Sequence, residues 1–443
     1  MKFAMLTSFF GPHALGGCAS FVDRLSRALA RHGHEVHVIH CRDAFRVARK
    51  ERTARPYAVP SGVTVHTLSS PLGPLSPLAT HQTGRPGFKA RAIRSILASI
   101  RPDVVHFHNL SLIGGPGLLA MPAPGAVKLM TAHEHWLVCP THALWKHGRG
   151  VCVARECVRC CVQAKLPPQL WRKTPLLGRS LARLDALIAP SRSSILEHTR
   201  RGIAVPMTHL PPFLPDDHPD GAVAPAATTM PGRPYVAASG RLERIRGFQD
   251  VIEAMRRLPH LDLRIAGVGP FEAELRSRAE GMANVHFEGR LEGPRVAALF
   301  RGARAVAVPS LVYETFGNVA LEAFAERTPV VVRELGALPE MVAVSGGGLV
   351  FRDEDGLVAS LARLAGDDGL RRRLGSAGYA ARRGIWSESE HLERYLGLIQ
   401  DRRRTRRVRV DRAHAAPVPN LRARPVASTG PASGFGPSAG GPA

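Results

Sequence analysis

The amino-acid sequence predicts an α/β protein built from two doubly wound domains. Apolar segments of strand length alternate with amphipathic helical segments through two long blocks. Such alternation implies parallel sheets that are covered by helices on both faces. A proline-rich stretch separates the blocks, and 443 residues are enough for two or three domains. Ligands of doubly wound sheets bind at the carboxyl ends of the strands, so we expect both domains to face a central cleft.

The first block defines a domain over residues 1–205. The apolar stretch from Phe3 to Phe10 is too short for a signal peptide, so we interpret it as a strand and expect a cytoplasmic protein. A turn at Gly16-Gly17 joins this strand to a helix whose apolar residues recur at helical spacing. Strands are predicted at 3–7, 35–40, 63–68, 104–108, 127–131 and 186–189, and helices at 88–100 and 191–201.

The second block defines a domain over residues 235–385, after a linker at 206–234. Its predicted strands are 235–239, 261–266, 285–288, 305–308 and 330–332, and its predicted helices are 247–257, 271–280, 295–301 and 319–325. Residues 401–443 begin with an Arg-rich run and continue with Pro, Ala, Gly and Ser, which predicts a disordered basic tail.

The composition excludes some classes of protein and favours others. A hydrophobic content of 44% excludes global disorder. No apolar run approaches the roughly 18–20 residues of a spanning helix. The chain holds 60 Lys and Arg against 36 Asp and Glu, a net charge of +24. This excess favours anionic partners such as nucleotide phosphates, nucleic acid or a membrane surface.

Two carboxylates, Glu314 and Glu322, lie on either side of a predicted helix start. The backbone N–H groups of Phe316, Gly317, Asn318 and Val319 would be unpaired there, which makes an anion-binding helix N-terminus. The carboxylates can accept hydrogen bonds from neutral hydroxyls. The combination points to a nucleotide-sugar, with phosphate at the helix and sugar and ribose hydroxyls at the two carboxylates.

The segment from Glu314 to Glu322, continued by Ala-Phe-Ala and by Thr328-Pro-Val-Val, resembles the family 4 retaining glycosyltransferases. The resemblance covers nearly all of residues 1–400 and implies the GT-B fold, with two Rossmann-like domains facing a cleft. It implies a hexosyl transfer from a nucleotide-diphosphate-sugar donor to a hydroxyl acceptor. Glu314 would contact the donor sugar and Glu322 the ribose. A C-terminal helix at 386–400 would cross back to the first domain.

A second segment that matches the family contains Gly240, Arg241, Arg246 and Gly247. In the family, two cations at these places neutralise the donor diphosphate, and the second is usually Lys. Here the planar fork of Arg246 replaces a point charge. The resemblance also places near the donor the glycines of three loops and one further cation, namely Gly16, Gly17, Gly240, Gly267 and Arg290.

His108 and His133 each follow a predicted strand of the first domain. The family often has His at these places, on the acceptor side near the transferred sugar. The alternative is that both are partly buried structural residues. A retaining transferase needs no separate base when the leaving phosphate takes the proton of the acceptor, so leaving-group stabilisation and acceptor positioning matter most. No cofactor is expected for catalysis.

A cysteine-rich insert at 139–161 follows His133 and would lie beside the acceptor side of the cleft. Cys157 and Cys160 have the spacing of a metal knuckle, and Cys139 and Cys152 would complete four ligands. Two interpretations stay open, a structural zinc loop and unliganded thiols. A subset of the family carries a similar insert.

The sequence thus predicts a transferase of cell-surface polysaccharide or glycolipid synthesis, acting on lipid-linked glycans at the inner face of the cell membrane. We expect no specific nucleic-acid partner. The alternative is a non-catalytic GT-B scaffold that binds anionic polymer or membrane, which the net charge of +24 favours. The pairs Glu314/Glu322 and Arg241/Arg246 favour the enzyme.

Overall fold

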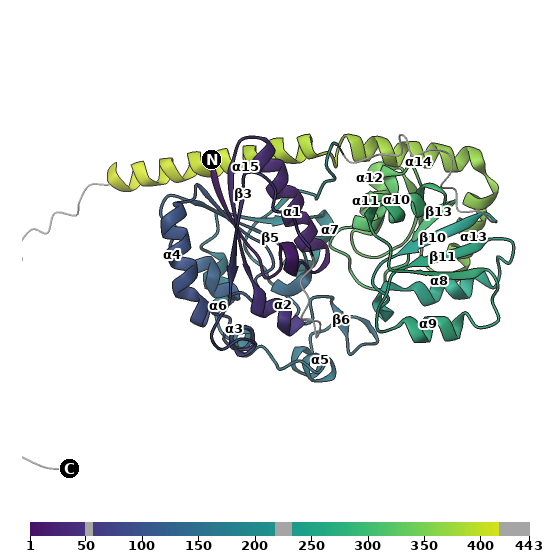
Figure 1. The fold of residues 1–443 in the computed structure, drawn as a ribbon, viewed down its shortest axis with the longest axis horizontal. Coiled ribbons are helices and arrows are strands. Elements are labelled where there is room, and N and C mark those ends of the chain that lie inside the picture. Colours follow the sequence, from purple (N-terminus) through teal and green to yellow (C-terminus); the bar gives the residue numbers. More distant parts are fainter. Residues whose placement is uncertain (49–55, 218–232, 416–443) are drawn as a thin grey trace, which may run out of the picture. The chain divides into compact units, whose positions relative to one another are not determined.

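The computed structural model describes residues 1–48, 56–217 and 233–415, and the side chains as far as residue 406. Residues 1–402 form one compact unit. It contains two large sheets in which every paired strand is parallel, as the alternation of strands and helices predicts (Figure 1). No helix in these ranges is both long enough and apolar enough to cross a bilayer.

The first sheet has seven strands in the order β3-β2-β1-β4-β5-β8-β9. Its central strand sends alternate side chains to opposite faces, because the side-chain period of a strand is two. Phe3 and Met5 enter one hydrophobic core, and Ala4 and Leu6 enter the other. The strands are β1 (Lys2–Leu6), β2 (Glu35–Cys41), β3 (Val63–Leu68), β4 (Val104–Phe107), β5 (Val127–Thr131), β8 (Ala186–Ala189) and β9 (Met207–His209).

Helices cover both faces of this sheet (Figure 1). The α-helices are α1 (Gly16–Arg31), α2 (Arg42–Ala48), α3 (Leu75–Thr83), α4 (Ala90–Ile100), α5 (Cys157–Gln163), α6 (Leu176–Leu181) and α7 (Arg192–Arg200). The 3₁₀ turns are η1 (Gly11–His13), η2 (Gly87–Lys89), η3 (Pro116–Ala120), η4 (His135–Leu137) and η5 (Leu170–Lys173). A small hairpin in the insert pairs β6 (Trp145–Lys146) with β7 (Gly150–Val151).

The predicted linker begins too early. Residues Met207–His209 form β9, the edge strand of the first sheet, and pair with β8. Proline is tolerated beside an edge strand because one side of that strand needs no ladder hydrogen bonds. Pro206 and Pro211 flank β9 in this way. Residues 218–232 of the predicted linker lie outside the described residues.

The second sheet has six strands in the order β12-β11-β10-β13-β14-β15. The strands are β10 (Tyr235–Ser239), β11 (Asp262–Ala266), β12 (Val285–Gly289), β13 (Ala305–Val308), β14 (Val330–Arg333) and β15 (Gly348–Phe351). The edge strand β15 is absent from the prediction, because it is short, follows a run of glycines and lacks a clear alternation. Two hydrophobic cores again lie on opposite faces.

The helices of the second domain connect these strands. They are η7 (Arg244–Arg246), α8 (Phe248–Met255), α9 (Glu272–Arg278), α10 (Gly293–Arg301), α11 (Asn318–Ala325), α12 (Leu338–Ser345), α13 (Glu354–Gly366) and α14 (Asp368–Arg383). The four predicted helices agree in place with α8, α9, α10 and α11, and their ends differ by a few residues, whereas α12, α13 and α14 are absent from the prediction.

The last helix, α15 (Glu388–Ala415), follows the second domain but packs on the first. Leu392, Tyr395, Leu398 and Ile399 belong to the same buried cluster as residues of β1 and α1. These contacts place its first turns against a core that is otherwise formed by the first domain and the residues just after β9.

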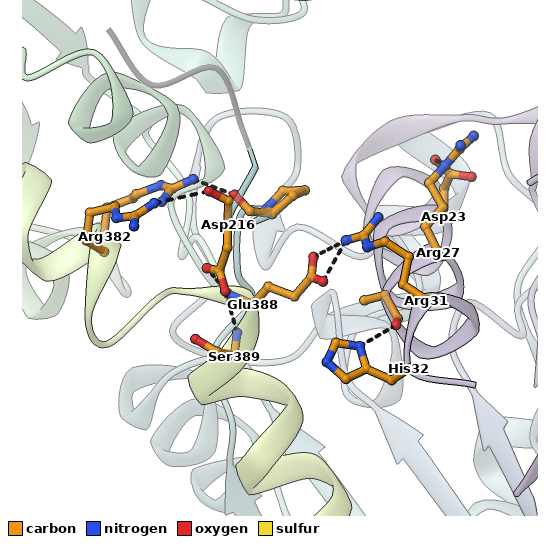
Figure 2. A network of polar contacts seen from close by, with 11 residues as sticks. Asp23, Arg27, Arg31, His32, Asp216, Arg382, Glu388 and Ser389 are labelled. Atoms are coloured by element: carbon orange, nitrogen blue, oxygen red, sulfur yellow. Dashed lines mark hydrogen bonds and ion pairs between the residues drawn. The ribbon is translucent and has the colours of Figure 1, made fainter. Parts of the chain in front are cut away.

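Polar contacts fix the start of α15 (Figure 2). The carboxylate of Glu388 accepts two hydrogen bonds from Arg31 Nη2, each 2.6 Å long. Asp216 accepts from the backbone N–H groups of Glu388 at 2.9 Å and Ser389 at 3.1 Å. Asp216 thereby satisfies N–H groups that have no partner within the helix.

The prediction of a disordered tail from residue 401 is wrong for its first fifteen residues. Here α15 continues through the Arg-rich run to Ala415. Arg is a good helix former, and no Pro or Gly interrupts the chain between Gly397 and Pro417. Residues 416–443 lie outside the described residues.

Candidate functional site

Glu314 and Arg246 meet at the carboxyl edge of the second sheet. Arg246 Nη1 donates to Glu314 Oε1 over 2.5 Å, and Ser310 Oγ donates to the same oxygen over 2.8 Å. The Glu314 side chain is 20% exposed and that of Arg246 is 39% exposed. Both of these hydrogen bonds use Oε1, so Oε2 can accept from a ligand. The two residues that the sequence predicts to act on a donor are therefore brought together and oriented.

A glycine determines how closely the Arg246 turn approaches the Glu314 loop. η7 ends at Gly247, which has a φ of 76° in the left-handed region. A Cβ atom on Gly247 would lie 2.0 Å from the carbonyl oxygen of Pro309. Leu311 N also donates to Ile245 O over 2.8 Å. Only glycine fits both this backbone conformation and this contact.

The other predicted donor loops of the second domain end neighbouring strands. A Cβ on Gly267 (φ 147°) would lie 1.8 Å from the Gly240 carbonyl oxygen, so these two loops are in direct backbone contact. Arg290 is exposed just after β12. Arg241 is 69% exposed and forms an ion pair with Glu243 at 3.1 Å, so it lies outside the Glu314–Arg246 pair.

The N-terminus of α11 faces the N-terminus of α1 in the first domain. α11 begins at Asn318 with Gly317 as its N-cap residue and Val319 as its second residue. A Cβ on Gly17 would lie 2.8 Å from Asn318 Nδ2. The Asn318 Oδ1 atom is buried and has no hydrogen-bond partner. Free N–H groups of a helix start and a buried unpaired polar atom thus point into one place.

Phe316 and Gly16, which are predicted to lie near the donor, have different structural roles. Phe316 is 7% exposed and its ring packs edge-on against Trp386, so its side chain serves the core and only its backbone can reach a ligand. A Cβ on Gly16 would meet nothing within 4 Å, and its φ of 72° needs glycine for the turn alone.

Glu322 faces a cation that the sequence analysis missed. Burial raises the pKa of Glu322, and the positive charge of Arg24 on α1 opposes this rise. Arg24 Nε is itself buried without a hydrogen-bond partner. Arg24 lies two helical turns after Gly17, and Glu322 lies one turn after Asn318, so each pair shares one face of its helix. The spacing from Gly17 is the signal that could have identified Arg24.

His108 and His133 form a hydrogen-bonded pair at the carboxyl edge of the first sheet. His108 Nδ1 and His133 Nε2 lie 3.0 Å apart. Burial lowers the pKa of His133 to about 4 and that of His108 well below its usual value, so both are neutral at pH 7. His106 packs beside His108 and contacts the hydroxyl of Tyr395 on α15 at 2.9 Å. The histidine pair is therefore supported from the last helix.

Hydrogen bonds join the His133 loop to the Glu314 loop across the two domains. Thr315 Oγ1 donates to the carbonyl oxygen of His133 over 2.6 Å, and His135 Nε2 lies 3.0 Å from the carbonyl oxygen of Tyr313. Nearby, the Glu340 carboxylate accepts from the first two N–H groups of α7. Residues on both sides of Glu314 are thus fixed by the first domain.

The buried histidines predict a loss of stability in mild acid. Burial lowers the pKa of His135 to about 3 and that of His391 to about 4, whereas in the unfolded chain the value is about 6.5. These neutral side chains contribute their full stabilisation above about pH 6.5. Each has lost about 1.4 kcal/mol of it at about pH 5.5, because the unfolded chain binds a proton there and the folded chain does not. Thermal unfolding between about pH 7.5 and 5 measures it. His391→Asn should flatten the profile, whereas the exposed His260→Asn should not. A Tm that does not change with pH would contradict this assignment.

The predicted zinc site is not supported. Within the described ranges, no group of three or more His, Cys, Asp or Glu side chains is arranged to hold a metal ion. The thiols are directed to separate partners: Cys139 Sγ to Thr141 Oγ1, Cys152 Sγ to Ala154 O, and Cys160 Sγ to His147 Nδ1. Burial raises the pKa of Cys152 and Cys157, which favours neutral thiols. All five cysteines of the insert are free.

Two family models match most of the chain. The model described as Glycosyltransferase Family 4 matches residues 15–218, and the model described as Glycosyl transferases group 1 matches residues 233–367. The chain is 29% identical over 406 residues to D-inositol 3-phosphate glycosyltransferase of Xylanimonas cellulosilytica, covering 84% of this chain and 89% of that protein. It is 28% identical to MMP α-(1→4)-mannosyltransferase of Mycolicibacterium hassiacum, covering 85% and 92%.

Solved structures share the fold. Sucrose-phosphate synthase from Thermosynechococcus elongatus matches with a TM-score of 0.70 and 21% identity over 90% of this chain and 98% of that one. HepE from Anabaena, solved in complex with UDP, matches with a TM-score of 0.63 and 15% identity over 90% and 100%. From these matches and from the Glu314–Arg246 site at the edge of the second sheet, we conclude that the chain belongs to the family 4 glycosyltransferases and has their GT-B fold.

Proposed function

We propose that this glycosyltransferase moves a sugar from a nucleotide-diphosphate-sugar to a hydroxyl acceptor, with retention at the anomeric carbon. The observation that carries the proposal is the oriented Glu314 carboxylate. One of its oxygens is held by Arg246 and Ser310, and the helix start at Asn318 follows four residues later.

The donor half of the site follows from charge. The diphosphate binds between the guanidinium of Arg246 and the free N–H groups of α11, both of which stabilise the negative charge that develops on the leaving group. Glu314 Oε2 accepts from a hydroxyl of the sugar. Glu322, one turn inside α11, accepts from the ribose hydroxyls, and the positive charge of Arg24 opposes the rise in its pKa that burial causes.

The reaction needs no separate base. The bond between the anomeric carbon and the leaving phosphate oxygen breaks, and the acceptor oxygen bonds to that carbon on the same face. The leaving phosphate takes the proton of the acceptor hydroxyl. His108 and His133 are neutral, so they position the acceptor by hydrogen bonds instead of by charge.

The acceptor that we propose is a lipid-linked glycan or polysaccharide precursor, reached at the inner face of the cell membrane. The net charge of +24 supports contact with an anionic bilayer. The relatives point the same way, because one matched protein of Mycobacterium tuberculosis is named a GDP-mannose-dependent α-(1-6)-phosphatidylinositol dimannoside mannosyltransferase.

A panel of UDP-, GDP-, ADP- and TDP-sugars tests the donor half, with thermal shift and slow donor hydrolysis as readouts. We expect one donor to stabilise the wild type and to be hydrolysed, and we expect Glu322→Ala to lose both effects. If no nucleotide raises the Tm while heparin does, the protein is a non-catalytic scaffold for anionic polymers and the proposal fails.

A further inference from the structure

The cysteine-rich insert holds a basic cavity that the transfer reaction does not use. The cavity has a volume of about 270 Å³ and lies between the β6–β7 hairpin and α5. It is lined by Lys146, His147, Arg149, Gly150, Val151, Arg159 and Gln163.

The charges around this cavity are unbalanced. Glu156 is the carboxylate that contacts its lining, through ion pairs with Lys146 and His147 and a longer one of 3.7 Å with Arg159. Arg159 is 71% exposed, and Arg149 has no ion-pair partner among the described side chains. Three fixed cations against one carboxylate leave a surplus of positive charge, and two guanidinium groups are available to an anion. Guanidinium groups bind phosphate well because they offer paired donors.

Exposed apolar side chains lie next to these cations. The helix α5 supplies Arg159 and Gln163 to the cavity and also carries Val158 and Val162, which are 50% and 64% exposed. Val153, between β7 and α5, is 89% exposed. Cations and exposed apolar side chains on one short segment are typical of a surface that enters the headgroup region of a bilayer.

The insert is tied to the candidate acceptor side. His142, near its start, contacts the carboxylate of Glu134 at 2.6 Å, and Glu134 directly follows His133. Residues of β6, β7 and α5 line the same cavity, and Figure 1 shows β6 and α5 close together. A ligand of the cavity would therefore bind to the insert that follows the His133 loop along the chain.

We propose that this cavity binds the phosphate group of an anionic lipid, with Val153, Val158 and Val162 entering the bilayer surface. The role of this lipid site rests on the proposed function, because the site would hold the transferase where a lipid-linked acceptor lies. The lipid site itself would exist whether or not the chain transfers sugar.

Binding of the full chain to vesicles tests the site. Phosphatidylcholine vesicles with and without phosphatidylglycerol are compared by co-sedimentation. Arg149→Ala combined with Arg159→Ala should weaken partitioning to the anionic vesicles about 30-fold, at about 1 kcal/mol per cation. The matched control is Arg91→Ala with Arg94→Ala on α4, which removes the same charge from exposed positions of the same domain and should change binding less than about 3-fold.

The remaining outcomes separate the sources of phosphate and the two proposals. Val158→Ser with Val162→Ser should also weaken vesicle binding, because the apolar contacts are lost. Equal binding by wild type and the Arg149/Arg159 variant would overturn the proposal. Displacement of the vesicles by low concentrations of inorganic phosphate would assign the cavity to a soluble anion instead of a lipid. Without lipid, the wild type and all these variants should hydrolyse the donor at the same rate. If the wild type itself hydrolyses no donor, the transferase proposal fails and the lipid site is unaffected.

Discussion

Replacing Glu314 by Gln is expected to lower kcat by about 10²–10³-fold while the protein stays folded. The amide keeps an oxygen for the hydroxyl of Ser310, but it removes the negative charge that orients Arg246 and the acceptor oxygen that the donor sugar needs. Arg246 is 39% exposed, so the loss of its ion pair costs about 1 kcal/mol or less of folding stability. Initial rates with the donor identified by thermal shift measure the effect.

The control for this substitution is Glu334→Gln. Glu334 is also ion-paired, with Arg352, but on the exposed surface of the second domain. Its loss should leave turnover unchanged. If Glu314→Gln and Glu334→Gln have the same activity, Glu314 has no part in the reaction, and the similarity of this loop to the family's motif reflects fold alone.

Replacing Gly247 by Ala is expected to destabilise the second domain by at least about 3 kcal/mol. A side chain at a φ of 76° costs about 1–2 kcal/mol, and the new Cβ would overlap the carbonyl oxygen of Pro309, 2.0 Å away. The loops can relieve the overlap only by moving apart, which separates Arg246 from Glu314. Thermal unfolding should therefore report a lower Tm, and the donor should bind more weakly.

Gly281→Ala distinguishes the two causes. Gly281 has a nearly identical φ of 75°, but a Cβ there would meet nothing within 4 Å. It should show the conformational cost alone and keep full donor binding. Equal losses of stability in the two variants would mean that the contact with Pro309 is easily relieved, and that Gly247 is needed only for its backbone conformation.

Hydrophobic periodicity predicts most of the fold because each internal strand is nearly continuous in apolar residues. It fails at the edges, where β9 and β15 are short and partly exposed. Composition misleads at α15, where the Arg-rich run predicts disorder although Arg supports helices. Composition describes what a segment can bury, and a long helix can persist with little burial once its first turns are packed.

The candidate site also contains some residues that local sequence motifs indicate and others that only the folded structure reveals. Glu314 and Arg246 are found from local motifs, because the loop that carries each is short and its shape follows from nearby glycines. Ser310 and Arg24 could not be assigned, since their partners depend on how two loops or two domains meet. The arrangement of the described thiols does not support the zinc interpretation, because spacing along the chain does not determine where thiols point.

The position of α15 has a consequence for synthesis of the protein. Leu392, Tyr395, Leu398 and Ile399 complete a core whose other residues all belong to the first 213 positions of the chain. A ribosome releases these residues only after the whole second domain has been made, so the first domain cannot reach its final packing while it is being translated. The nascent first domain must keep an apolar groove open until then, and a chain that stops before residue 388 leaves that groove without its natural occupant.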